Sequence, residues 1–342
     1  MRTLTTGGWA LVLLVLMLGC PLALPTLGSA AGGGEVVVYS ARIEQLIQPM
    51  FDAFTAKTGI KVKTFSASEA ELFERLKAEE ARTPADVLMT VDVGNLWLAQ
   101  QAGLLQEFGS PVIEKNIPAH LRAKHNEWVG LSVRARTIAY STERVKPGEL
   151  STYEALGDPR WRGRLGLRTS KKVYNQSMVA TMIKTLGESR TEEVLRGWMA
   201  NEPRIFSSDT KLLEAIAAGQ CDVGLVNTYY LAQLKAKEPS LPVALFWPNQ
   251  QDRGVHVNIS GAGVTRYAKH RAEAIRLIEF LSLPETQNLY ADVNYEYPAN
   301  PHVKPNALLA GWGTFKADQV DVAAAGEYQA AAVKLMDRVG WK

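Results

Sequence analysis

The stretch DVGLVNTYYLAQLKAK, residues 222–237, contains an apolar run of strand length that leads directly into a helix-like segment. Two adjacent tyrosines, Tyr229 and Tyr230, stand where the strand gives way to the helix. In open α/β sheets, ligands bind beyond the carboxyl ends of the strands, where loops lead into helices. The two tyrosines therefore occupy a position at which ligand-binding side chains are expected.

The same order of strand and helix recurs along the chain. The segments EVVVYSAR, KVKTFSA, ADVLMTV, GRLGLRTS and CDVGLVN predict strands. Helices are predicted for IEQLIQPMFDAFTAKTGI, EAELFERLKAEEA, YNQSMVATMIKTLG, TKLLEAIAAGQ and, as one long helix, RAEAIRLIEFLSLPETQNLYA. This alternation indicates mostly parallel sheets flanked by helices. Because 342 residues exceed one ordinary core, we expect two α/β lobes of similar build.

The composition is that of a soluble globular protein, with 46% hydrophobic and 21% charged residues. A net charge of +3 is too small to indicate a nucleic acid or an anionic membrane surface as partner. The sequence has no Ser-His-Asp order, zinc motif or nucleophile elbow, so we do not expect an enzyme. The histidines show no ligand spacing; they are His120, His125, His256, His270 and His302.

The N-terminus resembles an export signal. Arg2 precedes the apolar run WALVLLVLMLG, which is too short to span a bilayer as a permanent helix. Two cleavage sites compete: a lipobox-like MLGC that would leave a lipidated Cys20, and the small-residue site SAA within a signal peptide over residues 1–31. An uncleaved anchor is the third alternative. Cys221 is then the one remaining cysteine, so no internal disulfide is expected.

Three tyrosines stand after predicted strands and could converge on one ligand. Tyr174 follows GRLGLRTS, as Tyr229 and Tyr230 follow CDVGLVN. Phenolate oxygens suit a hard, highly charged cation, and ferric iron is the common biological cation that tyrosinate binds. A free phenol has a pKa near ~10, but a trivalent ion favours the phenolate at neutral pH. Paired tyrosines in an ordinary core are the competing interpretation.

An anion would complete such a site. Three phenolates balance the charge of Fe³⁺ but leave coordination positions that carbonate could fill. Arginine holds oxyanions through its bidentate fork, and Arg42 and Arg134 are the candidates. Ser170 and Asn227 lie in the strand-end loops, beside helix N-termini that also favour anions. Alternatively, the arginines and Ser170 form an anion site without a metal, and the tyrosine rings stack against the bound solute.

Several segments resemble the periplasmic ferric-ion-binding proteins, the solute-binding components of iron ABC transporters. They are PADVLMTVD, STYEALGDPRWRGRLGLRTSKKVYNQS, VGLVNTYY, FWPNQQDRGVHVNISGAGV and NYEYP, and the resemblance extends from about residue 35 to residue 342. It implies a two-lobed α/β fold of the periplasmic solute-binding type (type II), with two hinge crossover strands near SVRAR and HVNIS. We expect lobe one to hold residues 35–133 and 258–310, and lobe two residues 134–257 and 311–342.

The resemblance also assigns roles by position. It implies that Tyr229 and Tyr230 bind iron, and that Tyr174 matches a third tyrosine used in part of the family. Arg134 matches an arginine near the bound anion, and Arg42 matches one that helps to hold carbonate.

The sequence departs from the family at two places. Many members have a histidine after the first arginine, where this chain has Ile43 and Glu44. The glutamate ligand of other members corresponds to Val91, which Asp92 follows. The chain therefore resembles the subgroup whose protein ligands are all tyrosines. Whether Glu44 or Asp92 contributes is left open.

The function implied is that of a monomeric, extracytoplasmic carrier. It would capture Fe³⁺ between its lobes and deliver the ion to an ABC permease driven by an ATPase. It would meet the membrane only through that permease or a lipid anchor at Cys20. The alternative is the same fold with another solute, such as an oxyanion, a polyamine or a small organic molecule. The identity of the anion and the oxidation state of iron in the cell stay open.

Overall fold

The computed structural model describes residues 34–342. The predicted signal peptide and both of its cleavage sites, including the lipobox at Cys20, lie outside the described residues. Within residues 34–342, no helix is both long enough and apolar enough to cross a membrane. Cys221 is a free, buried cysteine, and burial raises the pKa of its thiol to about 12.

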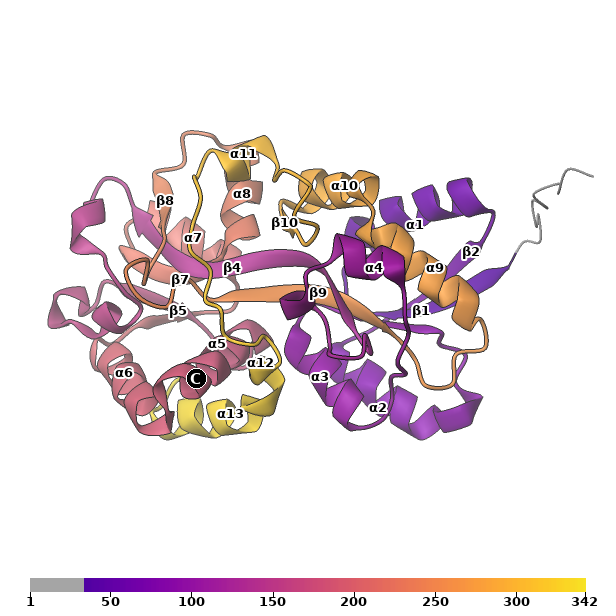
Figure 1. The fold of residues 1–342 in the computed structure, drawn as a ribbon. Coiled ribbons are helices and arrows are strands. Elements are labelled where there is room, and N and C mark those ends of the chain that lie inside the picture. Colours follow the sequence, from indigo (N-terminus) through magenta and orange to yellow (C-terminus); the bar gives the residue numbers. More distant parts are fainter. Residues whose placement is uncertain (1–33) are drawn as a thin grey trace, which may run out of the picture. The chain divides into compact units, whose positions relative to one another are not determined.

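One lobe contains the first three strands. Strand β1 (Glu35–Ser40) pairs in parallel with β2 (Lys61–Ser66) and β3 (Val87–Thr90), and β3 pairs antiparallel with β9 (Val257–Val264). Figure 1 shows the helices of this lobe around its sheet. They are α1 (Glu44–Thr58), α2 (Glu69–Glu79), α3 (Val93–Gln101), α4 (Pro111–Asn116), α9 (Arg271–Ser282) and α10 (Pro284–Asn294).

The other lobe is built on the second half of β4 (Val129–Ser141). This half pairs antiparallel with β7 (Val223–Asn227) and β8 (Val243–Phe246). Strand β7 pairs in parallel with β5 (Leu165–Arg168), and β5 pairs in parallel with β6 (Arg204–Phe206). Its helices are α5 (Val173–Leu186), α6 (Glu188–Ala200), α7 (Asp209–Ala217), α8 (Thr228–Lys237) and α13 (Gln329–Arg338). The predicted two-lobed α/β fold is confirmed.

Strands β4 and β9 run side by side from one lobe to the other (Figure 1). They pair from Val129↔Ala262 to Ala135↔Val257, and the short β10 (Tyr297–Pro298) also pairs with β4. One apolar core holds residues 36–131 and 259–299, and others hold residues 135–257 and 332–341. Val322 and Ala325, close to α12 (Ala324–Glu327), join the first core. The lobe boundaries themselves stay a prediction.

The long helix predicted over RAEAIRLIEFLSLPETQNLYA is wrong as a single element. It divides into α9 and α10 at Leu283, whose backbone is extended at φ −67° and ψ 150°. Pro284 is the first residue of α10, where its missing N–H costs nothing. The proline ring disfavours a helical conformation at the residue before it, which ends α9.

Candidate metal centre

The three tyrosines and both arginines predicted to bind iron and an anion line one cavity of about 340 Å³. Tyr174, Tyr229 and Tyr230 reach it from α5 and α8, at the carboxyl ends of β5 and β7. Arg42 reaches it from the loop after β1, and Arg134 from β4. The topology therefore brings together side chains that are up to 188 positions apart in the sequence, from Arg42 to Tyr230.

The two adjacent tyrosines lie in the first turn of α8. Their rings are 4.4 Å apart between centroids and inclined at 40°, and both side chains are half-buried. Asn227 Nδ2 donates a hydrogen bond of 3.2 Å to the Tyr229 hydroxyl, and Arg168 Nη1 donates one of 3.5 Å to the Tyr230 hydroxyl. Each phenol oxygen therefore has its own polar support at the cavity wall.

Burial and mutual repulsion disfavour ionised phenols in the free protein. Burial raises the pKa of Tyr174, and the neighbouring Tyr230 raises it further, whereas Arg134 opposes both effects. Burial also raises the pKa of Tyr229, followed by the effects of Tyr174 and Tyr230. A cation that binds Tyr174 and Tyr229 as phenolates must therefore displace their protons. A cation of high charge favours this displacement, because it stabilises phenolates that lie close together.

A buried carboxylate below the cavity supports both members of the tyrosine pair. Asp209 is fully buried, and its Oδ2 is 3.1 Å from Arg136 Nη1 and accepts a 3.0 Å hydrogen bond from the Asn227 amide. Its Oδ1 is 3.5 Å from Arg168 Nη1. Arg136 Nη1 also donates to Asn227 Oδ1 at 3.0 Å. Asp209 thus fixes the two groups, Asn227 and Arg168, that contact the phenol hydroxyls.

The two arginines each keep hydrogen-bond donors free. Arg42 is 5% exposed and pairs with Glu296 at 2.8 Å, and Arg134 is 2% exposed and pairs with Asp92 at 3.4 Å. Within residues 34–342, Arg42 Nε and Nη1 and Arg134 Nη1 are buried without a hydrogen-bond partner. Buried donors without partners are costly, so an oxyanion in the cavity would satisfy them.

The two carboxylates that the sequence left open do not line this cavity. Glu44 is exposed on the first turn of α1. Asp92 is fully buried, where its side chain caps α3 at the Gly94 amide (2.9 Å) and accepts from Ser177 Oγ at 2.8 Å. With Arg134 also bound to it, Asp92 has a structural role.

Two further predicted anion-binding residues lie elsewhere. Asn227 lies below the cavity, where its side chain bridges Arg136 and the Tyr229 hydroxyl instead of capping α8. Ser170 faces a separate surface pocket beside the C-terminus, and its amide donates to the Lys342 carbonyl at 3.2 Å. A direct contact between Ser170 and an anion stays a prediction.

Sequence reasoning missed several charged residues around the site. Glu69, Lys172 and Glu296 line the cavity, and Arg168 and Asp209 lie beneath the tyrosines. A signal existed for Arg168, because a buried strand that ends in arginine, as in RLGLRTS, needs a partner for that charge.

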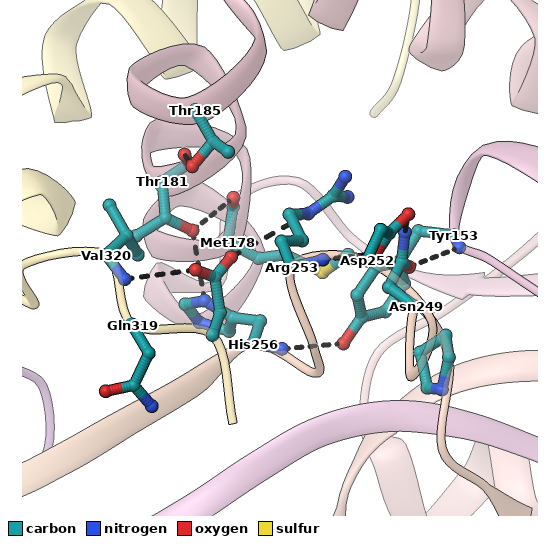
Figure 2. Close-up of polar contacts among 12 residues, drawn as sticks. Tyr153, Met178, Thr181, Thr185, Asn249, Asp252, Arg253, His256, Gln319 and Val320 are labelled. Atoms are coloured by element: carbon teal, nitrogen blue, oxygen red, sulfur yellow. Dashed lines mark hydrogen bonds and ion pairs between the residues drawn. The ribbon is translucent and has the colours of Figure 1, made fainter. Parts of the chain in front are cut away.

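His256, immediately before β9, lies in a buried polar cluster (Figure 2). Its Nδ1 is 3.0 Å from Thr181 Oγ1, and its amide donates to the Tyr153 hydroxyl at 3.0 Å. That hydroxyl in turn donates to the Arg136 carbonyl. Burial lowers the pKa of His256 to about 3, and Arg134 and Arg136 lower it as well. A neutral His256 therefore links the start of β9 to α5 through Thr181, and to β4 through the Tyr153 hydroxyl.

Within the described part of the chain, no three histidine, cysteine, aspartate or glutamate side chains are grouped so that they could hold a metal ion. The oxygen donors that line the cavity include the three phenols.

The sequence pattern of the bacterial extracellular solute-binding proteins matches residues 82–311. The chain is 41% identical to iron uptake protein A1 of Synechocystis, over 90% of this chain and 88% of that protein. It is 29% identical to the major ferric iron-binding protein of Neisseria meningitidis, over 90% of this chain and 93% of that protein.

Solved structures give the same result. The Trichodesmium protein IdiA (FutA), solved with iron and citrate ligands, has a TM-score of 0.86 and 44% identity, covering 90% of this chain and 100% of that chain. The apo ferric ion-binding protein A of Pasteurella haemolytica has a TM-score of 0.85 and 37% identity, covering 90% and 98%. This chain therefore belongs to the bacterial extracellular solute-binding proteins, together with relatives named for iron uptake and ferric-iron binding.

Proposed function

We propose that this protein is an extracytoplasmic carrier of ferric iron that binds the ion through Tyr174, Tyr229 and Tyr230. The observation that carries the proposal is the convergence of three phenols in one cavity with two buried arginines. Phenolates are hard oxygen donors, and three of them cancel the charge of Fe³⁺. The names of the relatives, which refer to iron uptake and ferric-iron binding, agree with this cargo.

An anion, for which carbonate is our candidate, completes the coordination of iron in this proposal. Arg42 and Arg134 hold it through the guanidinium N–H groups that have no partner within residues 34–342. Glu296 and Asp92 fix the orientation of these guanidinium groups through their other nitrogens. The anion then joins Arg42, from the loop after β1, to the tyrosines of the other lobe.

Binding of iron and anion favours the closed arrangement of the lobes, because only that arrangement lets both lobes contact the ligands. The closed carrier then delivers the ion to an ABC permease and its ATPase. We propose that the protein acts as a monomer in the periplasm and is not an enzyme. Export by the N-terminal signal, with or without lipid at Cys20, is part of the proposal.

The test is to replace Tyr229 and Tyr230 by phenylalanine, singly and together. We expect the phenolate-to-iron charge-transfer band to weaken in each single variant and iron affinity to fall by at least about 100-fold in the double variant, because neutral rings cannot replace charged ligands. Tyr267→Phe is the control, since Tyr267 is 43% exposed and away from the cavity.

Unchanged iron affinity in the double variant would refute the tyrosine site. A thermal-shift screen with oxyanions, polyamines and small organic solutes would then identify the ligand, because binding stabilises the native state by mass action.

A further inference from the structure

Glu69 lines the iron cavity from the lobe that also carries Arg42. It is the first residue of α2, directly after the N-cap residue Ser68. Ser68 Oγ accepts a 3.3 Å hydrogen bond from the Glu71 amide, so the cap of this helix does not need the Glu69 carboxylate. The Glu69 carboxylate is therefore available to a ligand in the cavity.

Of the residues that line this cavity, two carry carboxylates, Glu69 and Glu296, and they differ in their partners. Glu296 is 2.8 Å from Arg42 Nη2 and is therefore neutralised. Glu69 forms no ion pair within residues 34–342, and its Oε1 is buried without a hydrogen-bond partner. A buried carboxylate oxygen without a partner is costly, and a cation or donor in the cavity would offset that cost.

Glu69 shares the cavity with the three tyrosines. Burial raises the pKa of Glu69 and Asp92 raises it further, whereas Lys172 and Arg134 lower it. The Tyr174 side chain lines the same cavity as Glu69. Two ionisable oxygen donors that repel each other across a cavity become favourable neighbours once a cation lies between them.

We propose that Glu69 is a fourth protein ligand of ferric iron and the one that lobe one contributes. The inference rests on the proposed function, because it assumes that Tyr174, Tyr229 and Tyr230 bind the ion. A carboxylate oxygen is a hard donor and suits the same cation as the phenolates. With ligands from both lobes, iron joins them directly, and closure depends on the metal as well as on the anion. The sequence left open whether Glu44 or Asp92 contributes to the site; neither of them lines the cavity, whereas Glu69 does.

The experiment compares Glu69→Gln with wild-type protein during titration with ferric citrate in the presence of bicarbonate. Glutamine keeps the size of the side chain but removes its charge. Loss of an anionic donor makes the iron more electron-poor, so the phenolate-to-iron band should move to longer wavelength. Affinity, measured by competition with citrate, should fall at least about tenfold, as it does when groups that support a metal ligand are removed. Glu71→Gln is the matched control, because Glu71 is exposed on the same helix.

The position of the band decides the result. A shifted band in Glu69→Gln and an unshifted band in Glu71→Gln support coordination by Glu69. A band at the wild-type wavelength in Glu69→Gln overturns it, even if affinity falls, because the carboxylate would then act only through its neighbours. Wild-type protein without any charge-transfer band removes the tyrosine site and this inference together, so the two failures are distinguishable.

Discussion

Arg168 should strengthen iron binding without touching the ion. Its side chain is 10% exposed, and its Nη1 lies 3.5 Å from the Tyr230 hydroxyl. Its guanidinium carbon is 5.5 Å from the centroid of the Tyr174 ring and 5.9 Å from that of Tyr230. A fixed positive charge at this place favours the phenolate forms that ferric iron needs. Arg168→Met keeps much of the side-chain volume and removes that charge.

The size of the effect follows from the distance between the two groups. Unit charges 3.5 Å apart attract by ~1 kcal/mol with water-like screening and by ~5 kcal/mol at an effective dielectric constant of ~20. Asp209 Oδ1 lies 3.5 Å from the same Arg168 nitrogen and offsets part of the attraction. We therefore expect a loss of ~2 kcal/mol, which corresponds to iron affinity about 30-fold below that of the wild type.

The assay is competition between protein and citrate for ferric iron, followed by the charge-transfer band. Arg168→Lys should retain most of the affinity, because it keeps the charge but loses the planar fork. Arg162→Met is the control, since the Arg162 side chain is 66% exposed. Wild-type affinity in Arg168→Met would refute the reasoning, because a cation 3.5 Å from the Tyr230 hydroxyl would then have no influence on its phenolate.

Three further predictions concern the supports of the site. Asp209→Asn should destabilise the iron-free protein by ~3–5 kcal/mol in urea unfolding, because it leaves the buried Arg136 without its charged partner; a loss below ~1 kcal/mol would contradict this role. His256 has a pKa of about 3 in the folded protein, against 6.5 ordinarily, so the unfolded chain takes up a proton first as the pH falls through 6.5. Its contribution lowers stability by up to ~1.4 kcal/mol per pH unit below that value, and His256→Gln should unfold with a shallower pH dependence between pH 6 and 4; equal slopes would exclude the effect. Arg42→Gln should make the charge-transfer band less dependent on bicarbonate, and an undiminished dependence would remove Arg42 from the anion site.

Local patterns were sufficient to predict the elements that carry the tyrosines. The run DVGLV became β7, and the helix predicted after it begins at Thr228. Spacing could not show the break at Leu283, because apolar residues continue at helical intervals through both α9 and α10. The proline at position 284 was the signal, and its conformational effect outweighs the periodicity.

The supporting shell of the site could not be predicted in the same way, because its contacts join distant parts of the chain. Arg42 and Glu296 are 254 positions apart, and Arg136 and Asp209 are 73 apart. Glu69 looks like an ordinary acidic residue in the first turn of a helix, where the helix dipole alone would account for it. Only the packing of the lobes shows that one oxygen of its carboxylate is buried and that the side chain lines the same cavity as the tyrosines.

The most direct test of the central claim is a visible absorption spectrum of the purified protein during titration with ferric citrate, with and without bicarbonate. We predict a broad phenolate-to-iron charge-transfer band that saturates near one iron per chain and is stronger with bicarbonate. No band at any ratio of iron to protein would contradict coordination by Tyr174, Tyr229 and Tyr230.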